Sequence, residues 1–363
     1  MGSAPTVTGE CVQAPLQCLT PAGELAAPLP PGLDANRLVE IYRWMVRLRA
    51  FDSRALRLQR QGRLGTYAPY SGQEACQVCS VLPLQRTDWI CPTYRDHGAM
   101  MVHGVPMANI LRYWRGDEWG SHLPGVYTLP ISIPIATQCL HAVGLAWAAR
   151  LRGTGQVAVA YFGDGATSQG DFHEAMNFAG VFRLPVIFFC QNNLYAISVP
   201  LARQTAAPIV TKAAGYGVAA LRVDGNDPIA VWAAVSQAAA RARAGEGATL
   251  IEALTYRYGP HTTADDPTRY RSEDEVRQWQ ERDPITRLHR YLVHQGLWDA
   301  ASEEALQEQV KAEVAAAVAE AESLHPAPTD IFDYVYGEAP WYIREQRREV
   351  LAEARVGEGG GHG

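Results

Sequence analysis

From Asp34 onward, apolar residues recur at the spacing of a helix, and this pattern marks the start of the folded part of the chain. Asp34 is a typical N-cap residue directly before the first apolar position. The apolar stripe consists of Leu38, Ile41, Tyr42, Met45, Leu48 and Phe51. Residues 1–33 have little periodicity and many turn-forming residues, so we expect an N-terminal arm there.

Short apolar runs alternate with helical patterns through the centre of the chain. The patterns predict strands at 156–162, 185–191, 218–223 and 249–256, and helices at 137–152, 171–182, 208–215 and 228–244. A further helix is expected from Gln73, and a short strand and loop at 88–98. Such alternation is typical of a parallel sheet with helices on both faces, so we expect an α/β fold.

The last third of the chain is predicted to be mainly helical. Residues 257–272 form a polar loop, and 273–323 are helical with a break around the sequence GLWDAAS. We therefore assign 34–325 to one α/β domain with a helical extension. Residues 326–363 are expected to form a partner-contact segment, because 329–351 are rich in aromatic residues, and a disordered tail, GEGGGHG.

Composition excludes several classes of protein. With 47% hydrophobic and 19% charged residues among 363, the chain is typical of a globular protein with a substantial core. A formal net charge of −6 gives no support for a nucleic-acid partner. No secretory signal is visible and the longest apolar runs, such as PVIFFC, are too short to span a membrane, so a cytoplasmic location is expected.

The seven cysteines are an odd number, and reduced thiols are expected in the cytosol. Cys76 and Cys79 form a CxxC pair inside a predicted helix. Without a second pair, this spacing favours a structural role over a metal or redox site.

Residues 161–170, YFGDGATSQG, lie where a predicted strand gives way to a predicted helix, a common place for a phosphorylated ligand. The spacing of the glycines at 163, 165 and 170 does not fit the G-x-G-x-x-G of a dinucleotide fold, and the Gly-Lys-Ser/Thr of a P-loop is missing. A metal–diphosphate site and a tight turn with Asp164 as an N-cap both remain open.

The next predicted strand ends in QNNLYAIS, so Asn193 leaves the sheet at the same edge as Asp164. In a parallel sheet the two side chains can converge on one ion. Carboxylate and amide oxygens suit Mg²⁺, which shares its oxygen ligands with phosphate. Glycines at 163 and 165 let the backbone approach a diphosphate.

GDG at 163–165 and NN at 192–193, with 26 residues between them, resemble the motif of thiamine-diphosphate-dependent enzymes. The segments GRLGTYAPYSGQEA, TYRDHG, GDGATSQGDFHEAMNFAG, QNNLYAISVP and RYGPHTTADDPTRYRS resemble the alpha subunit of the heterotetrameric 2-oxo acid dehydrogenase decarboxylase component. That family includes pyruvate, branched-chain 2-oxo acid and acetoin members. The matching segments run in family order over nearly all of the globular part.

The resemblance implies a set of site residues. Asp164, Asn193 and the main-chain oxygen of Tyr195 would hold Mg²⁺. The residues along the diphosphate of thiamine diphosphate would be Tyr94, Arg95, Gly163, Gly165, Ala166 and Gln191. Ile133 and Ile135 would support the aminopyrimidine ring, and Thr137 and Gln138 match a monovalent-cation (K⁺) site of some members.

His261 begins the polar loop at 257–272, and a lone loop histidine is usually solvated and idle. The matching histidine of the family reaches the cofactor phosphate and assists acyl transfer to the lipoyl group, so the resemblance implies a catalytic role. A neutral-to-protonated imidazole suits that role at pH 7. Tyr270 and Arg271 would anchor the loop, which we expect to order when the cofactor binds.

The resemblance implies thiamine-diphosphate-dependent oxidative decarboxylation of a 2-oxo acid, with acyl transfer to lipoamide. The family's carboxylate against the aminopyrimidine comes from a beta subunit, so an α₂β₂ heterotetramer and a lipoyl acyltransferase partner are expected. Pyruvate is slightly favoured as the substrate. Two other classes stay open: a nicotinamide-dependent oxidoreductase, which the failed glycine spacing disfavours, and a non-catalytic scaffold subunit, which the presence of Arg95, Asp164, Asn193 and His261 disfavours.

Overall fold

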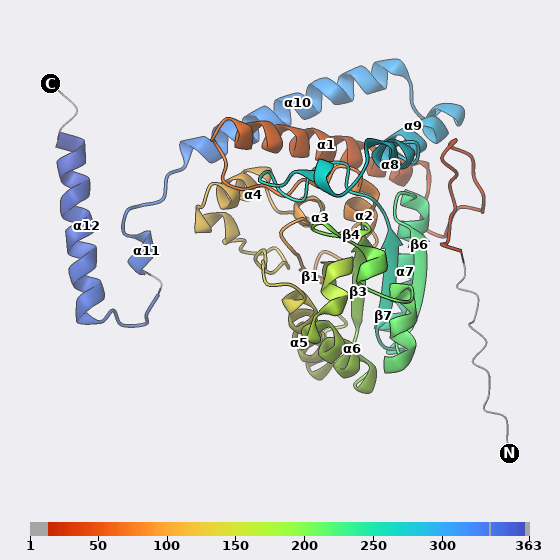
Figure 1. The fold of residues 1–363 in the computed structure, drawn as a ribbon, viewed down its shortest axis with the longest axis horizontal. Coiled ribbons are helices and arrows are strands. Elements are labelled where there is room, and N and C mark those ends of the chain that lie inside the picture. Colours follow the sequence, from red (N-terminus) through yellow and green to blue (C-terminus); the bar gives the residue numbers. More distant parts are fainter. Residues whose placement is uncertain (1–13, 334, 360–363) are drawn as a thin grey trace.

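The computed structural model describes residues 14–333 and 335–359, and side chains up to Glu353. Five parallel strands form the central sheet in the order β1-β2-β3-β7-β6 (Figure 1). The strands are β1 (Trp89–Cys91), β2 (Ala158–Gly163), β3 (Val186–Asn192), β6 (Ala219–Asp224) and β7 (Thr249–Leu254). The predicted α/β fold is confirmed.

Helices cover both faces of the sheet (Figure 1). The α-helices are α1 (Ala35–Arg60), α2 (Glu74–Cys79), α3 (His97–His103), α4 (Met107–Trp114), α5 (Thr137–Arg152), α6 (Gly170–Val181), α7 (Pro228–Arg243), α8 (Glu273–Gln280), α9 (Pro284–His294), α10 (Ala300–Ser323), α11 (Asp330–Asp333) and α12 (Trp341–Gly359). The segment predicted as a helix at 208–215 is a 3₁₀ helix, η4 (Ile209–Tyr216).

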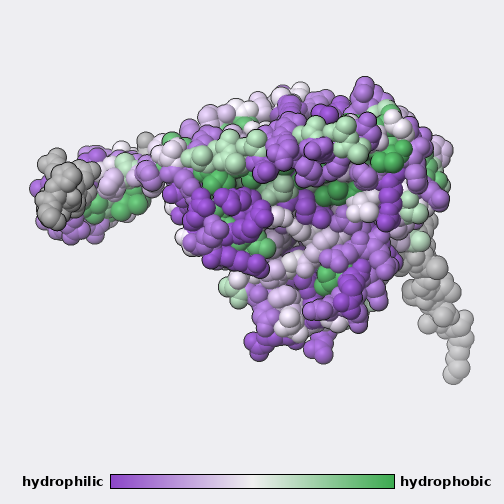
Figure 2. Space-filling view, turned by 90° about the horizontal axis from the view of Figure 1, so that it is seen from above, coloured by the Kyte–Doolittle hydropathy of each residue, from purple (hydrophilic) through white to green (hydrophobic). Residues whose placement is uncertain are grey.

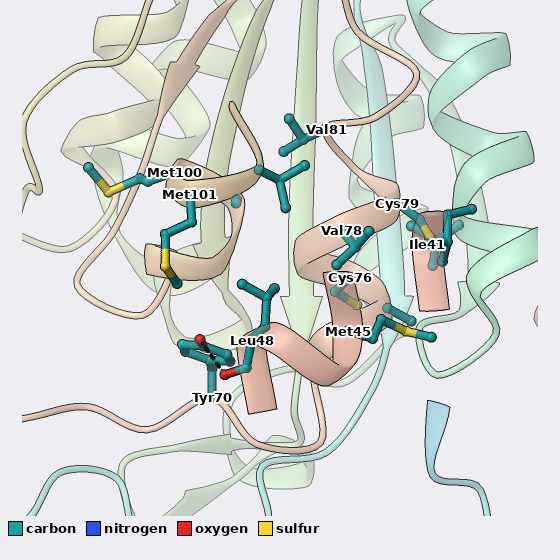
Figure 3. Packing of buried hydrophobic residues seen from close by; sticks show 14 of the residues in the cluster. Ile41, Met45, Leu48, Tyr70, Cys76, Val78, Cys79, Val81, Met100 and Met101 are labelled. Atoms are coloured by element: carbon teal, nitrogen blue, oxygen red, sulfur yellow. Dashed lines mark hydrogen bonds between the residues drawn. The ribbon is translucent and has the colours of Figure 1, made fainter. Parts of the chain in front are cut away.

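Alternate residues of the strands enter two separate hydrophobic clusters, as the period of two in a strand requires. Val159 and Tyr161 of β2 belong to the cluster with α1, α2 and α7, whereas Ala160 and Phe162 belong to the cluster with α5 and α6. The CxxC helix α2 lies inside the first cluster (Figure 3). Cys76 and Cys79 are fully buried free thiols there, and burial raises the pKa of both.

The N-terminal arm closes the β6 edge of the sheet. Leu16 donates its N–H to Arg222 O (2.8 Å) and accepts from Asp224 N (3.0 Å). The next two backbone amides, of Cys18 and Leu19, both donate to the Asp227 carboxylate, at 2.6 and 2.7 Å. These bonds tie the arm to the edge strand, while the first thirteen residues of the predicted arm lie outside the described residues.

The helical extension follows the sequence pattern, with one additional break. The predicted break lies between α9 and α10, where Asp299 caps α10, and a second break separates α8 from α9. Helix α10 lies along α1, to which it is joined by the ion pair between Arg47 and Glu313.

Beyond α10, helix α11 contacts the body of the molecule through the hydrogen bond from Trp119 Nε1 to Asp330 (2.9 Å), whereas α12 stands clear of the body (Figures 1 and 2). Trp341 and Ile331 are about two-thirds exposed there. The tail predicted to be disordered from residue 357 is helical as far as Gly359, because glycine disfavours a helix by only about 1 kcal/mol and does not forbid it. Residues 360–363 lie outside the described range.

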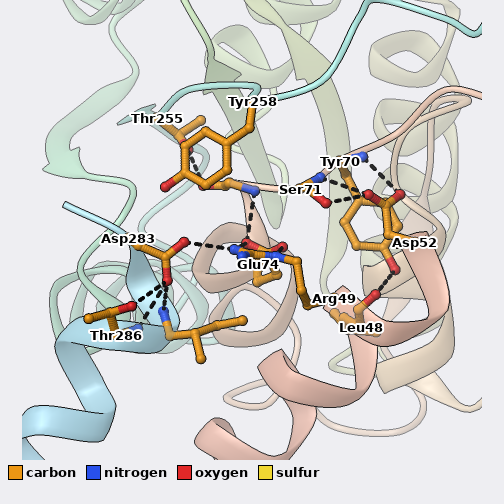
Figure 4. A network of polar contacts seen from close by, with 12 residues as sticks. Leu48, Arg49, Asp52, Tyr70, Ser71, Glu74, Thr255, Tyr258, Asp283 and Thr286 are labelled. Carbon is orange, nitrogen blue, oxygen red and sulfur yellow. Dashed lines mark hydrogen bonds and ion pairs between the residues drawn. The ribbon is translucent and has the colours of Figure 1, made fainter. Parts of the chain in front are cut away.

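Two buried polar contacts fix α1 against the loop and helix that follow it (Figure 4). The Asp52 carboxylate accepts hydrogen bonds from the Tyr67 hydroxyl, the backbone amides of Tyr70 and Ser71, and the Ser71 hydroxyl. Arg49 pairs with both Glu74 and Asp283, and so joins α1, α2 and α9. Among the described residues, no helix is long and apolar enough to cross a membrane.

Candidate functional site

A cavity of about 240 Å³ opens at the carboxyl ends of β2 and β3. Its lining comprises Gln73, Thr93, Tyr94, Arg95, Asp96, Ile135, Ala136, Gln138, Phe162, Gly163, Asp164, Gly165, Ala166, Gln169, Gln191, Asn193, Tyr195, Ala196, Ile197 and His261. This edge is where open α/β sheets bind ligands, because the connections leave a crevice beyond the strand ends.

The sheet register places Asp164 and Asn193 side by side. Gly163 of β2 pairs with Gln191 of β3, so the residues that follow each strand leave the sheet together. The Asp164 carboxylate is buried, and burial raises its pKa, whereas hydrogen bonds from the Gln204 amide and from the backbone of Asn193 lower it. No described salt bridge neutralises this carboxylate, so it is available to a cation.

The first turn after β2 leaves no room for a side chain at Gly165. A Cβ there would lie 2.7 Å from Ala196 Cβ, across the cavity wall. At Gly163 an added Cβ would meet only Gln191 O, at 4.0 Å, so the space beside its backbone is open. Asp164–Ser168 form the 3₁₀ helix η2, which brings this backbone along the cavity.

Three of the four described non-glycine residues with positive φ surround the cavity: Ala136 (70°), Leu194 (72°) and Ile197 (58°). Ala136 precedes α5, and the other two flank β4 (Tyr195–Ala196), which pairs with β5 (Val199–Pro200). Left-handed backbone costs free energy for such residues, about 1–3 kcal/mol each, and is concentrated at functional sites. The strained turn directs Asn193 and Tyr195 toward the cavity they line.

Two buried guanidinium groups lie beside the cavity without a carboxylate partner in the described part of the chain. Arg95 is 6% exposed and Arg257 is 1% exposed, and neither takes part in a described salt bridge. Arg95 donates to the carbonyl oxygens of Pro69 and His261. Arg257 donates to Ile197 O (3.3 Å) and the Tyr270 hydroxyl (3.1 Å), while its buried Nε has no partner.

The same two arginines determine the protonation of His261. Its Nδ1 lies 3.1 Å from Arg95 Nη2 and 2.9 Å from Arg257 Nη1. Guanidinium groups are donors only, so Nδ1 accepts and the proton of the neutral ring is on Nε2. Burial and the two positive charges lower the pKa of His261 to about 3. In the ligand-free arrangement we therefore expect a neutral ring at pH 7.

Contacts within the 257–272 segment hold His261 in place. The backbone N–H of His261 donates to Asp265 (2.7 Å), and the Tyr270 hydroxyl donates to the same carboxylate (2.5 Å). Arg271 donates to the carbonyl oxygens of Tyr258 (2.7 Å) and Gly259 (2.6 Å). The Tyr94 ring packs edge-on against the imidazole, with centroids 5.8 Å apart.

Most of the predicted site residues converge on the cavity. Ile133 and Thr137 are the exceptions, and Ile133 is half exposed outside it. Gln191 lines the cavity, but both ends of its amide are used inside the protein: Nε2 donates to Asp96, and Oε1 accepts from Gln73 and Gln77. Gln138 Nε2 donates to Ser132 O (2.8 Å), while its buried Oε1 has no partner.

The sequence did not identify two residues that contact the predicted site residues, Arg257 and Gln73. Arg257 directly follows the predicted strand 249–256, so its position after a strand was a usable signal. Gln73 is the N-cap of α2 and is far from Asn193 in the sequence, so nothing local marks the two as neighbours.

The donor set fits a diphosphate with a divalent cation. Arg95 and Arg257 are buried without a direct ion pair among the described residues and therefore favour an anion in the cavity, because a buried charge without a close partner is costly. Asp164 and Asn193 offer oxygen ligands, which suit a hard cation that is also held by phosphate. Among the described residues there is no group of three or more His, Cys, Asp or Glu that could bind a metal by itself, so a cation here needs oxygens from the ligand.

Comparisons with known proteins identify the family of the chain. The family "Dehydrogenase E1 component" matches residues 42–329. The chain is 48% identical over 326 residues to the 3-methyl-2-oxobutanoate dehydrogenase subunit alpha of Mycobacterium tuberculosis strain H37Rv, with 88% of each chain covered. It is 44% identical over 336 residues to the pyruvate dehydrogenase E1 component subunit alpha of Bacillus cereus, with 91% of each covered. The corresponding Staphylococcus aureus N315 subunit is 44% identical over 322 residues, covering 88% of this chain and 87% of its own.

Proposed function

The chain belongs to the dehydrogenase E1 component family, and from this premise we propose that it is the alpha subunit of a thiamine-diphosphate-dependent 2-oxo acid dehydrogenase. The observation that carries the proposal is the cavity at the strand ends, where Asp164 and Asn193 face two buried arginines and His261. A nicotinamide cofactor is not supported, because the glycine spacing after β2 does not fit its motif.

In this proposal, Asp164, Asn193 and the main-chain oxygen of Tyr195 hold Mg²⁺. The diphosphate lies along Gly163, Gly165 and Ala166 and meets the positive charges of Arg95 and Arg257. Tyr94 and His261 complete that side, and Ile133 and Ile135 support the aminopyrimidine ring. Gln191 lines the cavity without binding the diphosphate through its amide, since both ends of that amide are hydrogen-bonded inside the protein.

Bound thiamine diphosphate supplies an electron sink for the decarboxylation of a 2-oxo acid. The chain's own residues position and neutralise the diphosphate, and the Asp164 carboxylate beside it is buried. His261 presents an Nε2–H donor at the cavity, as its Nδ1 is fixed by the arginines. We propose that this donor acts in acyl transfer to the lipoyl group of the acyltransferase component.

The carboxylate that faces the aminopyrimidine in this family is proposed to come from a beta subunit in an α₂β₂ assembly. Two exposed apolar regions support such a partner: Ile133 and Ile135 beside the cavity mouth, and Ile331, Val335, Tyr336, Trp341 and Tyr342 on the C-terminal segment. A 19-residue helix such as α12 needs apolar cover, because isolated helices of this length are only marginally stable.

A monovalent cation is also proposed beside α5. The carbonyl oxygens of Ser132 and Pro134 both lie near the Gln138 amide, at 2.8 and 3.4 Å from Nε2. Rotation of this amide would exchange Nε2 for the unpartnered Oε1 and give three converging oxygens. Thr137 would add its hydroxyl oxygen.

The substrate is the open point of the proposal. The sequence slightly favours pyruvate, whereas the 48% identical relative is a 3-methyl-2-oxobutanoate dehydrogenase subunit. The chain should be co-expressed with its beta-type partner, and decarboxylation of pyruvate and 3-methyl-2-oxobutanoate followed with an artificial electron acceptor. Turnover of either acid by the assembly, and of neither by the chain alone, supports the function, and the larger kcat/KM names the substrate. No turnover of any 2-oxo acid by a cofactor-loaded assembly contradicts it.

A further inference from the structure

Four buried side chains form an unbroken series of hydrogen bonds that ends at the cavity. Gln191 Nε2 donates to Asp96 Oδ1 (2.5 Å), Gln73 Nε2 donates to Gln191 Oε1 (3.0 Å), and Asn193 Nδ2 donates to Gln73 Oε1 (3.1 Å). We call this series the amide chain. Its members come from the N-cap of α2, from β3 and from the turns that follow β1 and β3, and each is 7% exposed or less.

An amide can be turned end for end with little change of shape, so its orientation must be set by its partners. Asp96 sets it at one end of the amide chain. Its Oδ2 accepts from the Thr93 backbone N–H and the Thr93 hydroxyl, both at 2.7 Å, and its Oδ1 accepts from Gln191 and from Gln77 (3.2 Å). All four neighbours donate, so Asp96 accepts at both oxygens.

A second contact fixes Gln191 in the same sense. Gln77 Oε1 accepts the backbone N–H of Ala99 (2.9 Å), so Gln77 must present its Nε2 group to Gln191 Oε1, at 2.7 Å. Gln191 Oε1 therefore accepts from both Gln77 and Gln73. Gln73 must turn its Nε2 toward it, and its Oε1 toward Asn193.

The consequence appears at Asn193. Its Nδ2 is committed to Gln73, so Oδ1 is the amide atom left for the cavity, where it accepts only a long bond from Tyr195 N–H (3.4 Å). An Asn193 turned the other way would present an NH₂ group, which repels a cation. We propose that Asp96, through Gln191 and Gln73, orients Asn193 so that its oxygen faces a divalent cation; this inference rests on the proposed function.

Gln73 is thus a positioning residue, and Gln77 offers a matched control. Both are glutamines at the same end of the molecule, at most 1% exposed, and both donate to Gln191 Oε1. Only Gln73 accepts from Asn193. Removal of either leaves a buried backbone or side-chain amide without its acceptor, so similar losses of stability are expected. In Gln77→Met, Asp96 still fixes Gln191 and Gln73 still holds Asn193, so only Gln73→Met frees Asn193 to rotate.

The test uses the full chain assembled with its beta-type partner and saturated with thiamine diphosphate, and measures Mn²⁺ affinity by electron paramagnetic resonance. Gln73→Met should weaken Mn²⁺ binding at least 10-fold, the usual effect of losing a side chain that orients a metal ligand, and Gln77→Met less than threefold. Equal affinities of Gln73→Met and wild type overturn the inference, and so do equal losses in both variants. If the wild type binds neither the cofactor nor Mn²⁺, the proposed function itself fails.

Neutron diffraction of the wild type provides a test that does not depend on a variant folding. Deuterium atoms should be seen on Asn193 Nδ2, which faces Gln73 Oε1. They should also be seen on Gln73 Nε2, which faces Gln191 Oε1. An Asn193 amide whose oxygen faces Gln73 would contradict the proposed orientation.

Discussion

Arg257 Nη1 lies 2.9 Å from His261 Nδ1 and donates a hydrogen bond to it. The imidazole is therefore neutral, with Nδ1 as an acceptor and Nε2–H as a donor. The positive charges that depress the pKa of His261 are the same ones that face the proposed diphosphate. Binding of that anion would offset them, so the histidine and the cofactor are expected to be electrostatically linked.

The pKa of His261 can be measured directly by ¹⁵N NMR of the histidine side chains. In the chain without cofactor, His261 should stay neutral from pH 8 down to pH 5, since burial and the two arginines lower its pKa to about 3. Arg257→Met should raise that pKa by at least one unit. Arg269→Met, in an exposed position of the same loop, should leave it unchanged; an unaltered pKa in Arg257→Met would show that the contact does not control the ring.

Because His97 is buried, we expect the folded protein to lose stability in mild acid. It is fully buried, its Nε2 lies 3.3 Å from Ala68 O, and burial lowers its pKa to about 3. In the unfolded chain this histidine binds a proton near its usual pKa of 6.5, whereas in the folded chain it does not, so stability is retained above pH 6.5 and falls as the pH drops toward 3. Between pH 7 and 5.5 the wild type should lose about 1 kcal/mol more than His97→Gln in urea unfolding. Parallel losses in the two proteins would contradict this.

The Asp52 carboxylate is expected to organise the segment 67–71. It accepts four hydrogen bonds from that segment, whose Pro69 and Tyr67 carbonyl oxygens in turn accept from Arg95 and from Thr263 N–H. Asp52→Ala would leave buried donors unpaired and should cost about 3 kcal/mol in unfolding free energy, with faster hydrogen exchange at Tyr70 and Ser71. A loss of unfolding free energy below about 1 kcal/mol would show that the segment keeps its conformation without the Asp52 carboxylate.

Gly180 in α6 allows the close approach of η4, because a Cβ there would lie 2.1 Å from the backbone oxygen of Tyr216. Gly180→Ala should destabilise the chain by about 2 kcal/mol or more in urea unfolding. Gly144→Ala in α5 is the matched control: no atom lies within 4 Å of its added Cβ, so it should be neutral or stabilising by up to about 1 kcal/mol. The same effect in both variants would contradict the packing argument.

The sequence was sufficient for those parts of the fold and site that follow from local pattern. Short apolar strands and the polar residues directly after them, Asp164 and Asn193, could be placed at one sheet edge because parallel strands share a direction. The left-handed turns at Leu194 and Ile197 could not be predicted, since neither position carries the glycine or asparagine that usually marks such a backbone.

The electrostatics of the site could not be derived from sequence order either. The protonation of His261 depends on Arg95, 166 positions away, and on the tertiary packing that desolvates both. The family resemblance implied a place for Gln191 along the diphosphate, but its Oε1 accepts hydrogen bonds from Gln73, the N-cap of α2, and from Gln77 within α2. These relationships depend on which helix covers the strand end, which the hydrophobic pattern does not specify.

The most direct test of the account is the affinity for Mg²⁺–thiamine diphosphate, measured by calorimetry on the chain assembled with its beta-type partner. Wild type should bind tightly, Asp164→Ala should lose at least 100-fold in affinity, and Asp171→Ala, which removes a neighbouring acid outside the cavity lining, should bind like wild type. Unchanged binding in Asp164→Ala, or no binding by the wild-type assembly, would contradict the claim that this strand-end cavity holds the cofactor.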